Sequence, residues 1–117
     1  MLRILVVDDE AHNREALSLL IHRLGHECLL AIDGSDALEK TLHQSFDLVL
    51  TDIRMPNMDG LAFFEAAQRL MGAHLPAFVF MTAYGRIEDA VEALRKGALH
   101  FLSKPLKKKE IVAILDE

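Results

Sequence analysis

Acidic, hydroxyl and basic side chains follow short apolar runs at four places in this chain of 117 residues. Each run has the length of a β-strand, and the polar residues come directly after it. These residues are Asp8, Asp9, Asp52, Thr82 and Lys104. If the strands are parallel, their carboxyl ends meet at one edge of the sheet, where open α/β sheets bind their ligands. Charged groups at the ends of buried strands are costly to desolvate, so their clustering indicates a shared role.

The three carboxylates would repel one another, and a divalent cation would relieve that repulsion. A set of ligands made only of oxygen atoms suits Mg²⁺, which keeps bound waters and an open position for a phosphate oxygen. Lys104 adds a mobile point charge that suits phosphate, and Thr82 offers a hydroxyl group. A carboxylate, a hard cation, an ammonium and a hydroxyl are the groups needed to move a phosphoryl group onto an aspartate.

Five short, largely apolar runs alternate with segments that have apolar residues at helical spacing. Strands are expected at Ile4–Val7, Cys28–Ala31, Leu48–Leu50, Ala77–Met81 and Phe101–Leu102. The helical stripes are Leu17/Leu20/Ile21/Leu24, Leu38/Leu42, Leu61/Phe64/Ala67/Met71, Ile87/Ala90/Val91/Leu94 and Ile111/Ile114/Leu115. Runs that are apolar throughout are typical of parallel strands covered on both faces. The pattern predicts five βα units in a doubly wound parallel α/β sheet with helices on both faces.

Residues that start and stop helices agree with this division. Gly25, Gly72 and Gly97 each follow a helical stripe, where a left-handed C-cap is expected. Asp59 precedes the third helical segment in an N-cap position.

Composition excludes several classes of protein. The length allows one packed core, and 51% hydrophobic with 26% charged residues excludes a disordered chain. The net charge of -5 disfavours direct nucleic-acid binding, and the single Cys28 cannot form an internal disulfide. No apolar run approaches the ~18 residues of a membrane span, and no signal peptide opens the chain. We therefore expect a cytoplasmic protein with no membrane partner.

The sequence resembles the receiver domain of response regulators in two-component signalling, over essentially the whole chain. Four motifs, each after an expected strand, carry the resemblance: Asp8-Asp9-Glu10, the run from Asp52 to Gly60 (DIRMPNMDG), Met81-Thr82-Ala83-Tyr84 and Lys104-Pro105-Leu106. The resemblance implies a flavodoxin-like fold of five parallel strands in the order 2-1-3-4-5. It makes residues 1–117 one receiver domain, with a shortened C-terminal helix and no output domain.

The resemblance also assigns the acidic cluster. Asp52 is the expected phosphoacceptor. Asp8 and Asp9 are expected to hold Mg²⁺ together with Asp52, and the backbone carbonyl of Arg54 completes the protein's share of the ligands. Mn²⁺ is expected to substitute for Mg²⁺, and no other cofactor is implied.

Further roles follow at the ends of the last two strands. Thr82 and Lys104 are expected to contact the phosphoryl oxygens. Thr82 and Tyr84 are expected to form the switch, with the Tyr84 ring changing rotamer on activation. The peptide bond between Lys104 and Pro105 is expected to be cis. We also hypothesise that Arg54 and Tyr84, both large, shield the acyl phosphate from water.

The implied function is a Mg²⁺-dependent phosphoacceptor switch, which takes a phosphoryl group from the phosphohistidine of a sensor histidine kinase. It catalyses only its own phosphorylation and dephosphorylation. The stretch from Thr82 to Pro105 resembles the nitrogen-regulation type, whose members act with an alternative sigma factor in transcription control. An output domain, with ATPase or DNA-binding activity, would lie outside this chain. Ile87 and Val91 belong either to the core or to a face of a phosphorylation-dependent homodimer.

Two other functions fit parts of the pattern. A small phosphohydrolase that works through an aspartyl phosphate would need an Asp-x-Asp motif, but Arg54 stands two residues after Asp52. It would also need an insertion long enough for a cap, and the chain has none. A nucleotide- or flavin-binding domain would need a glycine-rich loop after the first strand, where this chain has Asp8, Asp9 and Glu10.

Overall fold

The computed structural model describes residues 1–83 and 87–116. In these residues, parallel strands alternate with helices along the whole chain. The strands are β1 (Arg3–Val7), β2 (Glu27–Ala31), β3 (Leu48–Asp52), β4 (Ala77–Thr82) and β5 (His100–Ser103). The α-helices are α1 (Ala11–Arg23), α2 (Gly34–His43), α3 (Gly60–Met71), α4 (Ile87–Arg95) and α5 (Lys108–Leu115), and a short 3₁₀ helix covers Gly72–His74. Each expected strand is present, and each extends beyond its expected range by one or two residues.

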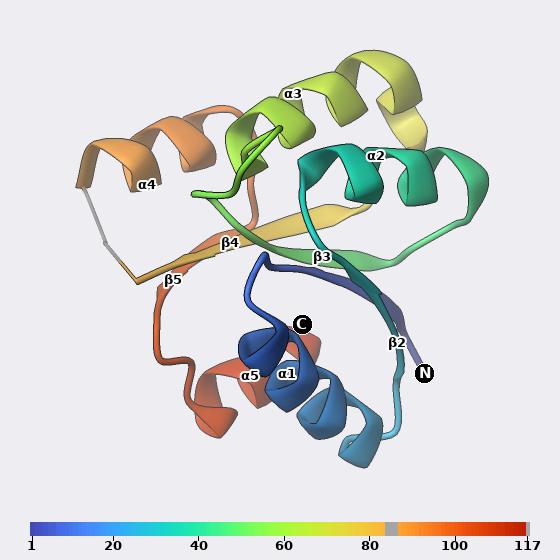
Figure 1. The fold of residues 1–117 in the computed structure, drawn as a ribbon, viewed down its shortest axis with the longest axis vertical. Helices are drawn as coiled ribbons and strands as arrows, with labels where there is room; N and C mark the ends of the chain where they lie inside the picture. Colours follow the sequence, from blue (N-terminus) through green and yellow to red (C-terminus); the bar gives the residue numbers. More distant parts are fainter. Residues whose placement is uncertain (84–86, 117) are drawn as a thin grey trace.

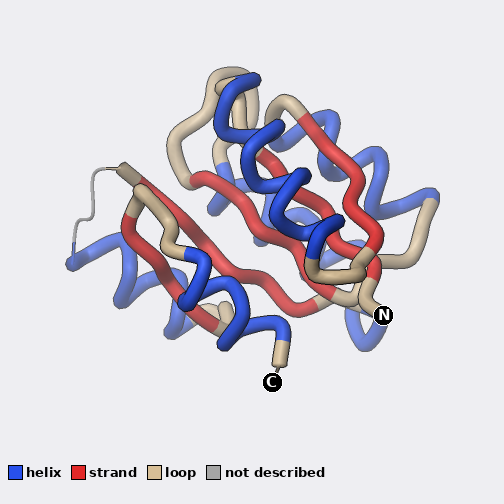
Figure 2. Tube along the Cα trace, turned by 90° about the horizontal axis from the view of Figure 1, so that it is seen from below, coloured by secondary structure: helices blue, strands red, loops and turns tan. Residues whose placement is uncertain are grey.

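The strands form one sheet in the order β2-β1-β3-β4-β5, and every neighbouring pair is parallel. This confirms the predicted flavodoxin-like arrangement. Helices α2, α3 and α4 cover one face of the sheet, and α1 and α5 cover the other (Figure 1). The view from below shows the same layering (Figure 2). All five carboxyl ends therefore point to one edge, as the sequence predicted.

Each strand of the sheet supplies side chains to two separate cores. On β1, Leu5 and Val7 pack under α2, α3 and α4, whereas Ile4 and Val6 pack against α1 and α5, and all four are fully buried. The first core also holds a stack of four rings, with neighbouring centroids 4.7 to 6.2 Å apart: Phe63, Phe64, Phe78 and Phe80. Burial of each ring stabilises the fold by about 1.5–3 kcal/mol, and the contacts hold α3 against β4.

The expected helix boundaries are present. The Asp59 carboxylate accepts a hydrogen bond of 2.8 Å from the backbone N–H of Ala62 and caps α3. Gly25, Gly72 and Gly97 all have positive φ, which residues with a Cβ rarely adopt.

Two of the expected helical stripes were wrong in part. Leu42 on α2 is exposed, while Ala37 faces the core. On α4, Val91 and Leu94 are both 48% exposed, and the small Ala93 packs on the sheet instead. A small side chain lets the helix approach the strands closely, which turns its larger apolar residues outward. The side chain of Ile87 lies outside the described part of the structure.

Among the helices of residues 1–83 and 87–116, none has both the length and the apolar character needed to cross a bilayer.

Candidate functional site

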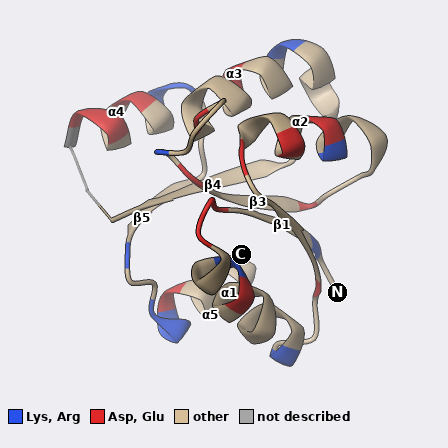
Figure 3. Cartoon of the chain, viewed as in Figure 1, with Lys and Arg blue, Asp and Glu red and all other residues tan. Residues whose placement is uncertain are grey.

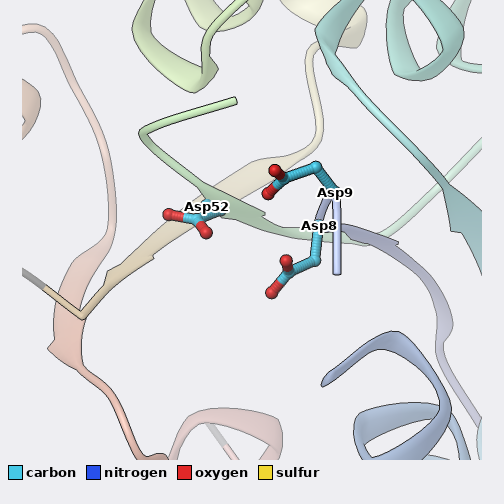
Figure 4. A group of neighbouring side chains, drawn as sticks. All are labelled: Asp8, Asp9 and Asp52. Atoms are coloured by element: carbon cyan, nitrogen blue, oxygen red, sulfur yellow. The ribbon is translucent and has the colours of Figure 1, made fainter. Parts of the chain in front are cut away.

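Three carboxylates meet where β1 and β3 end (Figure 4). Asp52 is the last residue of β3 and is 8% exposed. Asp8 directly follows β1 and is fully buried, while Asp9 beside it is exposed. One oxygen of each carboxylate lies within 4.8 Å of the others. Asp8 and Asp52 are 44 positions apart in the sequence, and the structure brings them together with Asp9.

The Asp8 carboxylate is held by the start of α1. Its Oδ1 accepts a hydrogen bond of 2.9 Å from the backbone N–H of Glu10. The guanidinium of Arg14 donates a bond of 2.7 Å to the Asp8 carbonyl. Sequence reasoning missed this role of Arg14, because a helical arginine six residues away is ordinarily a surface residue. These bonds aim Oδ2 of Asp8 toward the centre of the site.

Lys104 lies between the two buried carboxylates. Its Nζ donates hydrogen bonds of 2.7 Å to Asp8 Oδ2 and 2.9 Å to Asp52 Oδ2. The backbone N–H of Lys104 also donates to the carbonyl of Thr82 at 2.8 Å, which ties the loop after β5 to the end of β4. The peptide bond between Lys104 and Pro105 is cis.

The charges of the site alter two pKa values. Burial raises the pKa of Asp52, and the neighbouring Asp8 charge adds to this effect, while Lys104 opposes both. Burial lowers the pKa of Lys104, but its hydrogen bonds to Asp8 and Asp52 outweigh burial and raise it overall. One ammonium therefore does not fully offset the carboxylates, and a further cation would relieve the strain on Asp52.

The residues present fit Mg²⁺. All the candidate ligands are oxygen atoms, and ligands on opposite sides of one Mg²⁺ stand about 4 Å apart, close to the spacing of the cluster. The backbone also passes beside Asp52, since the N–H of Arg54 lies 3.4 Å from Asp52 Oδ1. Asp8, Asp9 and Asp52 are therefore the groups that would hold the ion, and the Arg54 carbonyl stays a prediction.

The close packing of Gly60 against the backbone of Asp52 explains why the motif that starts at Asp52 ends in glycine. A Cβ at this position would lie 2.1 Å from the carbonyl oxygen of Asp52, far inside contact distance. The N–H of Gly60 donates to the carbonyl of Ile53 at 2.8 Å, so the start of α3 rests directly on the end of β3. The backbone of Asp52 is thereby fixed from one side.

The sequence of this chain matches one known protein family over most of its length. Residues 4–116 match the family described as the response regulator receiver domain. This chain belongs to that family. The match spans nearly the whole chain, and it gives no support to the phosphohydrolase or the nucleotide-binding domain considered from the sequence.

The relatives of this receiver domain include longer regulators. It is 44% identical over 114 residues to the transcriptional regulatory protein ZraR of Escherichia coli strain K12, covering 97% of this chain and 25% of ZraR. The chain therefore spans about a quarter of that relative's length. The structure of NtrX from Brucella abortus aligns with a TM-score of 0.88 and 32% identity, over 98% of this chain and 26% of NtrX. These similarities support the nitrogen-regulation type.

An isolated receiver gives the same fold. The CheY-like receiver domain protein from Methanospirillum hungatei JF-1 aligns with a TM-score of 0.91 and 27% identity, over 99% of this chain and 91% of that chain.

Two more of the residues expected in the site, Thr82 and Arg54, lie at the ends of β4 and β3. Thr82 ends β4 and is 2% exposed. Tyr84 lies outside the described residues. The Arg54 guanidinium, which sequence reasoning placed beside the acyl phosphate, lies 3.5 Å from the Asp89 carboxylate on α4. The structure thus links the loop after β3 to α4.

An open pocket of about 700 Å³ leads into the site. Its walls include Asp9, Asp52 and Lys104, and it continues between Leu17 on α1 and Leu106 after β5. Figure 3 marks acidic residues in the loop after β1 and basic residues at the start of α5. The pocket mouth is therefore acidic on one side, which disfavours entry of a phosphate group without a cation.

Proposed function

We propose that this receiver domain is a Mg²⁺-dependent phosphoacceptor switch, in which Asp52 takes a phosphoryl group from the phosphohistidine of a sensor histidine kinase. The observation that carries the proposal is the position of Asp52. Its carboxylate faces the pocket, lies 2.9 Å from the Lys104 ammonium and shares its site with Asp8 and Asp9.

In the transfer, an Asp52 carboxylate oxygen attacks phosphorus in line with the nitrogen of the phosphohistidine. The O–P bond forms as the P–N bond breaks, and the imidazole leaves with the bonding electron pair. Mg²⁺, when bound, supplies positive charge that neutralises the transferring oxygens. Lys104 supplies a second charge, because its Nζ lies within hydrogen-bond distance of the attacking carboxylate and can follow a phosphoryl oxygen.

The pocket provides the route for the donor. It opens between α1 and the segment after β5, and its apolar lining there includes Leu17, Leu20 and Leu106. An amphipathic helix of the kinase that carries the phosphohistidine would contact these side chains while its imidazole reaches Asp52.

The phosphorylated state adds about one to two negative charges at Asp52. We expect the Thr82 hydroxyl to move toward the phosphoryl group, since Thr82 ends the neighbouring strand and pairs with Ser103 across β4 and β5. Movement there would pass to Tyr84 and α4, which follow directly in the chain. The charge added at Asp52 would in this way shift the domain from one conformation to the other.

The output is proposed to be transcription control. ZraR is named a transcriptional regulatory protein and is about four times as long as the match, so an output domain would lie outside this chain. Val91 and Leu94 expose apolar surface on α4, and we propose that they contribute to a homodimer formed after phosphorylation. Sedimentation with Mg²⁺ and beryllofluoride is expected to show the dimer. An unchanged monomer would contradict it.

The proposed function is tested by labelling with acetyl phosphate. We expect base-labile, acid-stable labelling of the wild-type chain that requires Mg²⁺ and is restored by Mn²⁺ after chelation. Asp9→Asn is the matched variant for the metal, because it removes an exposed carboxylate without touching the Lys104 contacts. It should require more Mg²⁺ for the same labelling. Labelling that is independent of the metal would contradict the proposal.

A further inference from the structure

The loop between β3 and α3 carries the Arg54 carbonyl yet has no regular structure of its own. Residues 53–59 contain neither helix nor strand. Arg54, Pro56, Asn57 and Asp59 are exposed, so apolar burial fixes this loop fully only at its first residue, Ile53, and in part at Met55 and Met58. A loop that presents a backbone ligand to a metal needs other contacts to hold its shape.

One such contact joins Asn57 to Asp33, which is 24 residues away in the chain. The Asn57 side-chain Nδ2 donates a hydrogen bond of 2.8 Å to Asp33 Oδ2. Asn57 has a φ of 67°, in the left-handed region where asparagine is better tolerated than most residues. The side chain and the unusual backbone at this position therefore both set the path of the loop.

Asp33 is itself firmly placed. It is 7% exposed, and its Oδ1 accepts a hydrogen bond of 2.8 Å from the N–H of Asp36, which caps α2. The bond from Asp36 and then the bond from Asn57 hold the pKa of Asp33 below its usual range. The carboxylate is therefore ionised at neutral pH and accepts both bonds at full strength.

The backbone next to Asp33 touches the same loop. The N–H of Gly34 donates to the carbonyl of Met58 at 3.0 Å. A Cβ on Gly34 would lie 2.4 Å from that carbonyl oxygen, so only glycine allows the approach. The loop thus rests on the start of α2 at one end and, through Gly60, on the end of β3 at the other.

We propose that Asp33 is a positioning residue of the metal site, which acts through Asn57 to hold the loop so that the Arg54 carbonyl is presented for the ion. This inference rests on the proposed function, because it concerns the same Mg²⁺ site. Mg²⁺ demands nearly ideal octahedral geometry, so a loop that is free to move presents its ligand at a cost in affinity.

The test measures the dissociation constant of Mg²⁺ by equilibrium titration and, separately, the rate of labelling by acetyl phosphate at saturating Mg²⁺. Asp33→Ser keeps a helix-capping oxygen but cannot reach Asn57, and Asn57→Gly keeps the left-handed backbone without the side chain. Each is expected to weaken Mg²⁺ binding by about tenfold, with the saturated rate nearly unchanged. The double variant should be no weaker than either single variant, because both remove the same bond.

Two matched variants separate positioning from general damage. Asp36→Asn removes a carboxylate from the same turn of α2 that bonds Lys40 and Ile32 rather than Asn57, and it should bind Mg²⁺ as the wild type does. Asp33→Asn should recover most of the affinity, since its amide oxygen can still cap α2 and its NH2 can donate to Asn57 Oδ1 once the exposed Asn57 amide turns over. Equal Mg²⁺ affinity in the wild type, Asp33→Ser and Asn57→Gly would overturn the inference, as would an equal loss in Asp36→Asn.

Hydrogen exchange of the unmodified chain gives a test without any variant. Mg²⁺ should slow exchange of the Gly34 amide, because the ion and the Met58 contact stabilise the same loop. Unchanged exchange in a chain that binds Mg²⁺ would overturn the positioning role. A wild-type chain that binds no Mg²⁺ would instead overturn the proposed function, so the two failures are distinguishable.

Discussion

The ammonium of Lys104 lies 2.9 Å from Asp52 Oδ2, so the proposed phosphoacceptor is paired with a cation before any phosphoryl group arrives. The same ammonium is 2.7 Å from Asp8, whose side chain is fully buried. Lys104 therefore occupies in part the place of the positive charge that Mg²⁺ would bring. Metal binding, stability and phosphorylation should all depend on this one side chain.

Replacing Lys104 with methionine should destabilise the metal-free chain and tighten its binding of Mg²⁺. The substitution leaves Asp8 and Asp52 without their cation, and breaking a buried pair in this way costs about 3 kcal/mol. Mg²⁺ should recover much of the loss, because it no longer shares the carboxylates with an ammonium. Urea unfolding with and without Mg²⁺ measures both effects.

Lys108→Met is the control for this change, since Lys108 is an exposed residue at the start of α5. It should leave stability within about 0.5 kcal/mol of the wild type. If the Lys104→Met chain is as stable as this control in the absence of Mg²⁺, the ion pairs of Lys104 with Asp8 and Asp52 contribute nothing to stability.

Asp52→Asn should stabilise the metal-free chain at neutral pH. The pKa of Asp52 is raised in the fold by burial and by Asp8, so the contribution of Asp52 to stability is fully present below its unfolded pKa of about 4 and is lost as pH rises through the folded value. Asparagine is neutral at every pH in this range, so the variant does not lose this contribution to stability as pH rises. The gain in Tm over the wild type, measured in chelator, should grow from pH 4.5 to pH 7.5 and amount to a few degrees. A gain that shrinks with pH would contradict this assignment.

Gly60→Ala should destabilise the chain by about 1–3 kcal/mol and slow phosphorylation, because the added methyl group would displace the Asp52 carbonyl. Gly25→Ala is the comparison. Its φ is 89°, but nothing lies within 4 Å of the added atom, so it should cost about 1 kcal/mol of backbone strain and leave phosphorylation unchanged. Thermal unfolding and the labelling rate separate the two. Equal labelling rates would argue against contact with the site.

Arg54→Ala should shorten the life of the acyl phosphate severalfold, since it removes a large side chain beside the proposed path of water. The ion pair of Arg54 with Asp89 lies at 3.5 Å and the Arg54 side chain is 55% exposed, so stability should change by no more than about 1 kcal/mol. Asp89→Ala breaks the ion pair but keeps Arg54, and should preserve the lifetime. Tyr84→Ala should act in the same direction as Arg54→Ala. Unchanged dephosphorylation in both would refute the shielding hypothesis.

The positions of the site residues could be predicted from the sequence, because each follows a strand and parallel strands end together. Asp8, Asp52 and Thr82 are all placed in this way by the observed sheet order. The contacts between loops could not be predicted. The bond of Asn57 to Asp33 depends on how two loops 24 residues apart approach each other, and no pattern of hydrophobic residues encodes that.

The outward face of α4 was also beyond prediction from periodicity alone. Val91 and Leu94 have the spacing of core residues, and the choice of Ala93 for the sheet depends on how closely the helix packs. An alanine such as Ala93 adds little to a hydrophobic pattern, yet on this short helix it is the residue that packs on the sheet.

The most direct measurement identifies the residue that carries the phosphoryl group. The chain is phosphorylated with acetyl phosphate and Mg²⁺, reduced with borohydride, and digested for mass spectrometry. Borohydride reduces an aspartyl phosphate to homoserine, so the peptide that contains Asp52 should lose the mass that separates aspartate from homoserine, and only in the phosphorylated sample. Homoserine at Asp8 or Asp9, or none at Asp52 despite labelling, would contradict the assignment of Asp52 as the phosphoacceptor.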